Sequence, residues 1–120
     1  MPSPTETAVR TYEAAWNEPD PDERARMIEA CFSTTGRIAT SAAGIEGRAA
    51  LAQAMTEFRA AGSTARIAGM LDIQGRKFRF HSTVEQPDGS ADPFFDAGEV
   101  DASGRIAVLV TFRGPMPTAS

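Results

Sequence analysis

Two polar side chains lie where the sequence predicts an apolar interior. Asp96 follows Phe94 and Phe95 in an alternating segment, and the alternation points its carboxyl group to the core side of a strand. Burial drives such an acid toward its neutral form, which can donate a hydrogen bond to a ligand. A register slip of one residue would instead place Asp96 in solvent. We therefore predict that Asp96 is a catalytic or ligand-orienting donor.

Tyr12 is the second candidate. It recurs at helical spacing with Val9 and Trp16, so a hydroxyl and an indole N–H lie on one apolar face of a helix. Glu13 is predicted to point to solvent. We expect Tyr12 to act with Asp96, and Trp16 to line the same site unless both aromatic rings only fill the core.

The other reactive side chains favour structural roles. His81 alternates with Phe78 and Phe80, so it is predicted to face outward from the sheet. Cys31 lies on the apolar stripe of a helix and is expected to pack there. These two residues are far apart in sequence and lack the spacing of zinc ligands, so no metal site is predicted. The glycines do not form a nucleotide-binding pattern, and we expect no cofactor.

Three helices followed by hairpins are predicted to carry these residues. Ser3-Pro4 and Asp20-Pro21 are each a capping residue followed by proline, and each predicts the start of a helix. After a short strand at 36–40 and a loop at 41–47, a third helix is expected from Arg48 to Gly62. The period then changes to that of strands, at 65–73, 76–85, 93–101 and 105–113. This order predicts an α+β domain with helices on one face of an antiparallel sheet.

Length and charge limit the class of protein. The 120 residues match one domain, 1–120, and the net charge of −4 leaves no positive field for nucleic acid or anionic lipid. No apolar run approaches the roughly 20 residues of a membrane span. Cys31 is the only cysteine, and the chain starts without a secretory signal pattern. We expect a cytoplasmic protein with no nucleic-acid or membrane partner.

The order of elements and three motifs carry a family resemblance. The motifs are YEAAWN at 12–17, IEGRAAL at 45–51 and DAGEVDASGRI at 96–106. Over residues 5–113 the chain resembles the SnoaL-like branch of the NTF2-like superfamily. The resemblance implies a cone of three helices folded over a curved sheet, with a pocket for a small, mostly apolar molecule. It also implies a homodimer formed through the outer sheet face.

A residue-by-residue comparison with the ketosteroid isomerases of that superfamily refines the site. Tyr12 and Asp96 fall on the positions of their tyrosine and protonated aspartic acid, which together stabilise an oxyanion. Their carboxylate base has no counterpart, because Thr40 and its neighbours provide no acid after the first strand. A threonine hydroxyl does not accept a proton near neutral pH. Activity on standard ketosteroids is therefore not expected unless another carboxylate reaches the substrate.

Two functions remain open at this point. The first is a small-molecule-binding SnoaL-like protein, with acid–base catalysis of the isomerase, cyclase or dehydratase type by Tyr12 and Asp96. The alternative is a non-catalytic binding or dimerisation module, which a cone filled by its own aromatic rings would favour. The residues expected to line the pocket and contact the ligand are Trp16, Phe32, Thr40, Met55, Phe58, Phe78 and Phe80.

Overall fold

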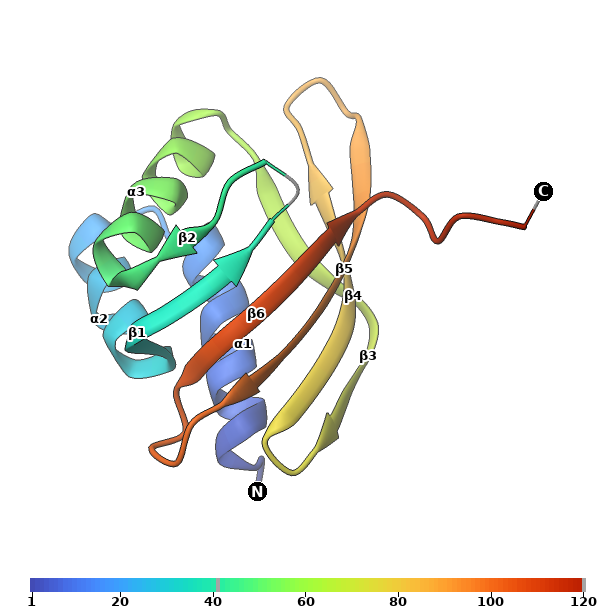
Figure 1. Cartoon of the computed structure of the whole chain (residues 1–120). Coiled ribbons are helices and arrows are strands. Elements are labelled where there is room, and N and C mark those ends of the chain that lie inside the picture. Colours follow the sequence, from blue (N-terminus) through green and yellow to red (C-terminus); the bar gives the residue numbers. More distant parts are fainter. Residues whose placement is uncertain (41, 120) are drawn as a thin grey trace.

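The computed structural model describes residues 1–40 and 42–119, which form three helices and a six-stranded sheet (Figure 1). The helices are α1 (Pro4–Asn17), α2 (Pro21–Cys31) and α3 (Gly47–Ala60). The strands are β1 (Phe32–Ala39), β2 (Ile45–Glu46), β3 (Thr64–Gln74), β4 (Lys77–Glu85), β5 (Ala91–Val100) and β6 (Ile106–Arg113). The expected α+β fold is confirmed. Among the described residues, no helix combines the length and the apolar character of a membrane span.

Most of the sheet is the predicted antiparallel meander. The strand order is β2-β1-β6-β5-β4-β3, and β3 to β6 pair antiparallel with their neighbours along the chain. The sheet as a whole is mixed, however, because β1 pairs parallel to β6. The predicted strand at 36–40 overlaps the second half of this longer β1, which ends at Ala39 and leaves Thr40 just outside it. The predicted loop contains the short β2, and Ser41 lies outside the described residues.

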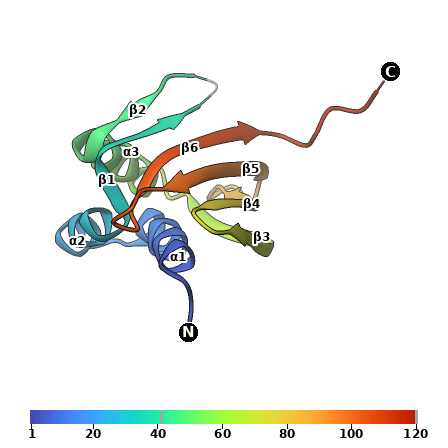
Figure 2. The ribbon, with the colours of Figure 1, turned by 60° about the horizontal axis from the view of Figure 1, so that its bottom comes forward.

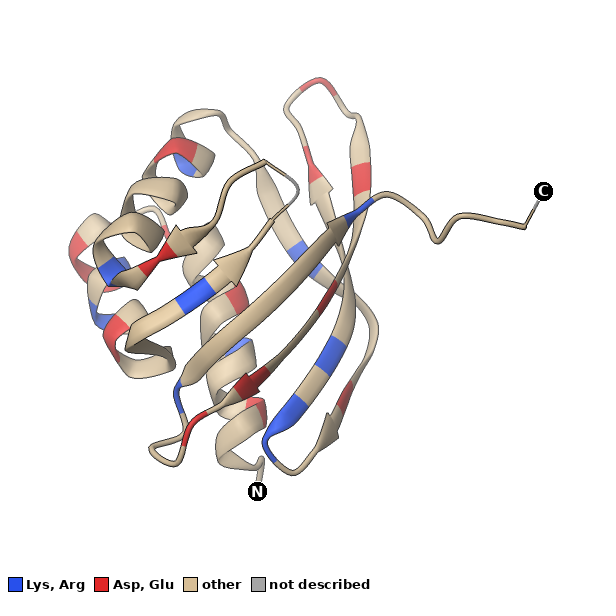
Figure 3. Ribbon diagram, viewed as in Figure 1, with Lys and Arg blue, Asp and Glu red and all other residues tan. Residues whose placement is uncertain are grey.

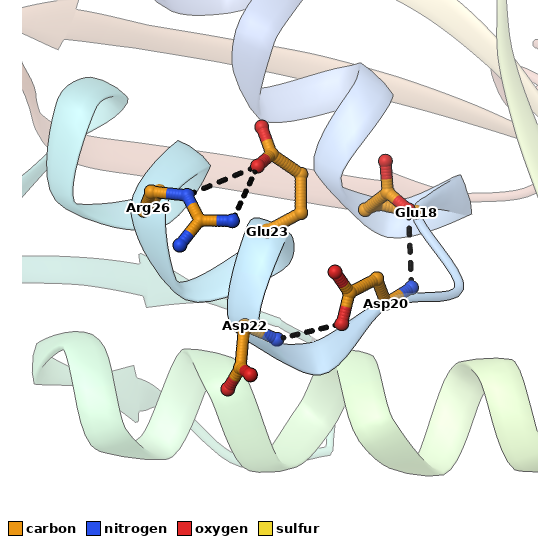
Figure 4. A network of polar contacts seen from close by, with 5 residues as sticks. All are labelled: Glu18, Asp20, Asp22, Glu23 and Arg26. Atoms are coloured by element: carbon orange, nitrogen blue, oxygen red, sulfur yellow. Dashed lines mark hydrogen bonds and ion pairs between the residues drawn. The ribbon is translucent and has the colours of Figure 1, made fainter.

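The caps of the first two helices form as the sequence predicts. The Ser3 hydroxyl accepts a hydrogen bond from the Glu6 N–H at 3.1 Å, and the Asp20 carboxylate accepts one from the Asp22 N–H at 3.2 Å. Figure 4 shows the second cap, together with the Glu18 carboxylate that receives the Asp20 N–H. Each cap satisfies a backbone donor at a helix start. The two caps therefore define where α1 and α2 begin.

All three helices lie on one side of the curved sheet (Figure 2). Helix α1 is attached to edge strand β3 and its hairpin at both ends. At its start, the Thr5 hydroxyl donates to the Gly75 carbonyl at 2.8 Å. At its end, the Asn17 amide donates to the Ala65 carbonyl at 2.6 Å and accepts from the Ala65 N–H at 2.8 Å. These bonds hold α1 in one position over the inner sheet face.

Candidate functional site

The inner sheet face and the helices enclose a cavity of about 390 Å³, which is in the size range of small-molecule sites. Its wall is mostly apolar or aromatic, and its polar groups come chiefly from α1, β5 and β6. The lining residues are Tyr12, Glu13, Trp16, Ile38, Thr40, Ile45, Phe58, Ala65, Ser82, Val84, Gln86, Asp92, Phe94, Asp96, Thr111 and Arg113.

Asp96 faces this cavity from β5. It is 7% exposed, and its cross-strand neighbours are Phe80 on β4 and Thr111 on β6. Within the described part of the chain, its Oδ1 atom has no hydrogen-bond partner. Burial raises the pKa of the carboxyl to about 6, although the hydroxyls of Thr111 and Ser82 act in the opposite direction. In the described structure Oδ1 is thus an unbonded oxygen with less than 1 Å² of exposed surface.

Glu13 supplies a second buried carboxyl group, and the prediction that it points to solvent is wrong. It is only 9% exposed and lines the cavity. Its Oε1 atom also has no hydrogen-bond partner among the described residues. Burial, with a smaller contribution from the negative charge of Asp96, raises its pKa to about 7. The signal was present in the sequence: Glu13 is four residues after Val9 and three before Trp16, on the same helical face.

An aromatic corner adjoins the two acids. Trp16 packs edge-on against Tyr12, with ring centroids 6.1 Å apart, and against Phe58 of α3, with centroids 5.1 Å apart. Burial, and then the charge of Asp96, raise the pKa of Tyr12 well above its ordinary value. The Tyr12 hydroxyl thus keeps its proton at neutral pH. It can donate to a ligand at the same end of the cavity as the carboxyls.

Thr40 also lines the cavity, but its hydroxyl is engaged in the turn after β1. It accepts from the N–H groups of Ala42 and Ala43 at 3.3 and 3.1 Å and donates to the Ala43 carbonyl. Such a hydroxyl cannot take up a proton near neutral pH. Glu13, from α1, brings to the cavity the additional carboxylate that the first strand does not provide.

Four aromatic or sulfur side chains expected at the pocket wall lie in the core instead. Phe32, Met55, Phe78 and Phe80 are buried but are not part of the lining described above. Phe78 and Phe80 do have the predicted inward orientation. Alternation specifies the face of a strand, whereas the depth of a side chain along the cone depends on neighbouring strands. The apolar wall residues that sequence reasoning missed are Ile38, Ile45, Ala65, Val84 and Phe94.

The remaining titratable candidates lie away from the cavity. His81 is exposed on the outer face, where its ring is 5.1 Å from that of Phe95. Cys31 is buried, and burial raises the pKa of its thiol to about 12. Within residues 1–40 and 42–119, no three His, Cys, Asp or Glu side chains come together as metal ligands do.

Charge is unevenly distributed along the cavity. Acidic and basic residues are interspersed over the helices and strands (Figure 3). Arg113 is the one cationic side chain in the described lining, and it is already 2.9 Å from the Asp92 carboxylate. Both members of this ion pair are partly exposed, whereas Glu13 and Asp96 are buried. The cavity therefore has two uncompensated carboxyls at its buried end and an ion pair toward solvent.

Solved structures with the same architecture place the chain in a family. A candidate isomerase of the SnoaL-like family from Agrobacterium tumefaciens superposes with a TM-score of 0.83 at 27% identity, covering 93% of this chain and 98% of the other. This chain is a SnoaL-like member of the NTF2-like superfamily. No protein-family model and no curated protein matches it.

Two further solved structures share the fold at lower identity. SalBIII, an epoxide hydrolase/cyclase-like enzyme of pyran ring formation in the polyether salinomycin, has a TM-score of 0.72 at 21% identity, covering 92% of this chain and 90% of its own. A candidate polyketide cyclase from Sinorhizobium meliloti has a TM-score of 0.70 at 20% identity, covering 88% and 93%. Since one fold serves many reactions, the function has to be argued from the site.

Proposed function

We propose that this SnoaL-like protein binds a small, mostly apolar molecule and transfers a proton within it, as an isomerase or cyclase does. One observation carries the proposal. Glu13 and Asp96 are two buried carboxyl groups that face one apolar cavity, and each has an oxygen without a partner among the described residues. Leaving a buried polar atom unbonded costs about 1–3 kcal/mol, and a ligand in the cavity would recover that energy.

The two acids are suited to different roles. Asp96 loses its proton first, because its pKa is about 6, and its negative charge then helps to hold that of Glu13 near 7. Between these values Asp96 is a carboxylate and Glu13 a neutral acid, a division typical of acid–base catalysis.

We assign to Asp96 the removal of a proton from carbon beside a carbonyl group. This is the opposite of the donor role expected from the sequence, because the lower pKa of Asp96 makes it the ionised member of the pair near neutral pH. Glu13 gives its proton to the carbonyl oxygen while Tyr12 donates a hydrogen bond to it, which leaves an enol. In a substrate with a neighbouring double bond, Asp96 then gives the proton to a different carbon of the conjugated enol and Glu13 recovers its own from the oxygen, which completes an isomerisation.

Hydrogen exchange at carbon tests this function without knowledge of the natural substrate. The probe is 1-indanone, an apolar ketone with protons beside its carbonyl, incubated with the protein in D₂O and followed by NMR. We expect deuterium incorporation faster than in buffer. Asp96→Asn should lower the enzymatic rate by about a hundredfold, the loss associated with removal of a general base.

Glu99→Gln is the matched control, since it removes an exposed carboxylate from the same strand. It should leave the exchange rate unchanged. Exchange no faster than in buffer for a panel of bound apolar ketones would contradict catalysis. In that case the non-catalytic binding module would be the better account.

We also propose that the outer sheet face binds a second copy of the chain and that the dimer functions in the cytoplasm. Phe112 is 60% exposed on that face and pairs across strands with Phe95, which contacts His81. An exposed aromatic group on a sheet face is a common feature of protein interfaces. The buried thiol of Cys31, the only cysteine, is compatible with a reducing compartment.

A further inference from the structure

The charge of the cavity wall limits which small molecules it can hold. At its buried end are two acids, and each of the two residues is more than nine-tenths buried with an unbonded oxygen in the described structure. The lining has no lysine or histidine, and its single arginine is paired with Asp92. A ligand that carries negative charge to this end would be repelled, whereas a neutral ligand would leave the ionised carboxylates uncompensated.

Aromatic rings stand beside the acids. Glu13 and Trp16 are three residues apart on α1, and Trp16 contacts both Tyr12 and Phe58. The faces of aromatic rings attract cations, and carboxylates with free oxygens accept hydrogen bonds from N–H groups. Both features favour the same kind of group, a protonated nitrogen attached to an apolar skeleton.

We infer that the ligand of this cavity is an apolar molecule with a protonated nitrogen, an amine or imine, whose N–H groups bond the free oxygens of Glu13 and Asp96. The inference rests on the proposed function, since it names the substrate class of the same site. In a protonated imine the C=N group takes the place of the carbonyl: Asp96 removes a proton from the carbon beside it, and the electron pair of that bond moves to the nitrogen to give an enamine. Because the nitrogen already carries its proton, Glu13 acts here only as the ionised partner of the N–H, and an amine, which has no C=N group, is bound but not converted.

The charged groups around the two acids are few. Helix α1 contributes Tyr12 and Glu13, β5 contributes Asp92 and Asp96, and β6 contributes Arg113. The lining residues of α3 and of β1 to β4 are uncharged. A bound cation stabilises the ionised form of the two acids. The affinity of the protein for a cationic ligand should therefore rise with pH as Asp96 and Glu13 lose their protons.

Three probes with one skeleton separate charge from shape: 1-aminoindane, 1-indanol and indane-1-carboxylate. Binding is measured by NMR shift changes at about pH 5 and about pH 8. We expect the amine to bind at least tenfold more tightly than the alcohol at pH 8, and the carboxylate to bind more weakly than either. The amine affinity should rise about tenfold from the lower to the higher pH, following the ionisation of Asp96.

Variants assign the effect to the two acids. Asp96→Asn and Glu13→Gln should each lower the amine affinity about tenfold and change the alcohol affinity less than twofold. The control Glu99→Gln should change neither. The pH dependence of the unmutated protein provides a second test that does not depend on how the variants fold.

The possible results distinguish this inference from the proposed function. Equal or tighter binding of 1-indanol, or an amine affinity that does not rise with pH, would overturn the inference, while exchange on 1-indanone would still support proton transfer. Absence of binding by every indane probe at millimolar concentration would overturn both.

Discussion

The carboxyl pKa of an aspartic acid is shifted in opposite directions on the two faces of the sheet. Asp72, on β3, lies among exposed side chains and pairs with Arg79 at 2.7 Å, and this contact lowers its carboxyl pKa. Asp96, on the inner face of β5, is buried with a free oxygen, and burial raises its pKa to about 6. A partner and solvent stabilise the charged form outside, whereas desolvation favours the neutral form inside.

This contrast distinguishes exposed acids that form ion pairs from buried acids that have no partner in the described structure. An exposed ion pair such as Asp72–Arg79 contributes little to stability. A buried acid without a partner reduces stability when it ionises, so its presence points to a role in binding or chemistry. Glu13 belongs with Asp96 in this respect, although it lies on a helix.

The largest predicted effect is the pH dependence of stability. Glu13 and Asp96 have folded-state pKa values of about 7 and about 6, above those of an unfolded chain. Their contribution to stability is complete below about pH 4 and is lost as the pH rises through 6 and 7. The double variant Glu13→Gln, Asp96→Asn should therefore remove this decline. At pH 8 its free energy of unfolding should exceed that of the unmutated protein by on the order of 3 kcal/mol.

Urea denaturation at about pH 5 and about pH 8 measures this difference. A double variant that is less stable than the unmutated protein at the higher pH would show that the two carboxylates are paired in solution. The inner and outer faces would then not differ as described.

A second prediction concerns the packing of the inner face. Gly98 pairs with Phe78 across β4 and β5, and a Cβ atom at this glycine would lie 2.7 Å from the Phe78 ring and against the Val108 carbonyl. Gly98→Ala should destabilise the protein by about 2 kcal/mol through overpacking. Thermal denaturation checks this, and an unchanged melting temperature would mean that the inner face is looser than the structure shows.

The outer face provides the third prediction, a change of assembly with little change of fold. If a second copy covers this face, Phe112→Asp should raise the dimer dissociation constant at least tenfold and alter monomer stability by less than about 0.5 kcal/mol. Met116→Asp places the same charge at an exposed residue outside the sheet and should leave the dimer intact. Analytical ultracentrifugation distinguishes these outcomes, and a monomeric unmutated protein at micromolar concentration would contradict the proposal.

The smallest effect is expected at Asp72. Because its folded-state pKa is lowered, its contribution to stability is present above the unfolded pKa and is lost as the pH falls through the folded value. Asp72→Asn should thus lower the stability of the protein slightly at neutral pH and reduce the stability that is lost in acid. The contribution of Asp72 to stability therefore increases with pH, whereas that of Glu13 and Asp96 decreases. An acid titration followed by circular dichroism measures this dependence of stability on pH. A variant that loses more stability in acid than the unmutated protein would contradict the prediction.

Local patterns in the sequence specified most of the fold. The caps at Ser3 and Asp20 predicted the starts of two helices, and the turns at Gly75, Gly89 and Gly104 have the positive φ angles expected between hairpin strands. The parallel pairing of β1 with β6 was not predicted. It joins segments about 70 residues apart, and no local pattern encodes such a contact.

The site was only partly predictable for a related reason. Alternation placed Asp96 on the inner face, and helical spacing placed Tyr12 and Trp16 on α1 toward the same cavity. Glu13 was assigned to solvent on the basis of its charge, although its spacing from Val9 and Trp16 indicated the buried face. Glu13 and Asp96 are thus two acids that go against the usual preference of charged residues for solvent, and only the periodicity of the sequence indicates their burial.

The central claim is that two carboxyl groups titrate abnormally in one cavity, and NMR titration of the side-chain carboxyl carbons measures this directly. We expect midpoints of about 6 for Asp96 and about 7 for Glu13. In Asp96→Asn we also expect a lower midpoint for Glu13, because the charge that helps to raise it is removed. Midpoints near 4 for both residues would show that the carboxyls are solvated or paired, and would contradict the account.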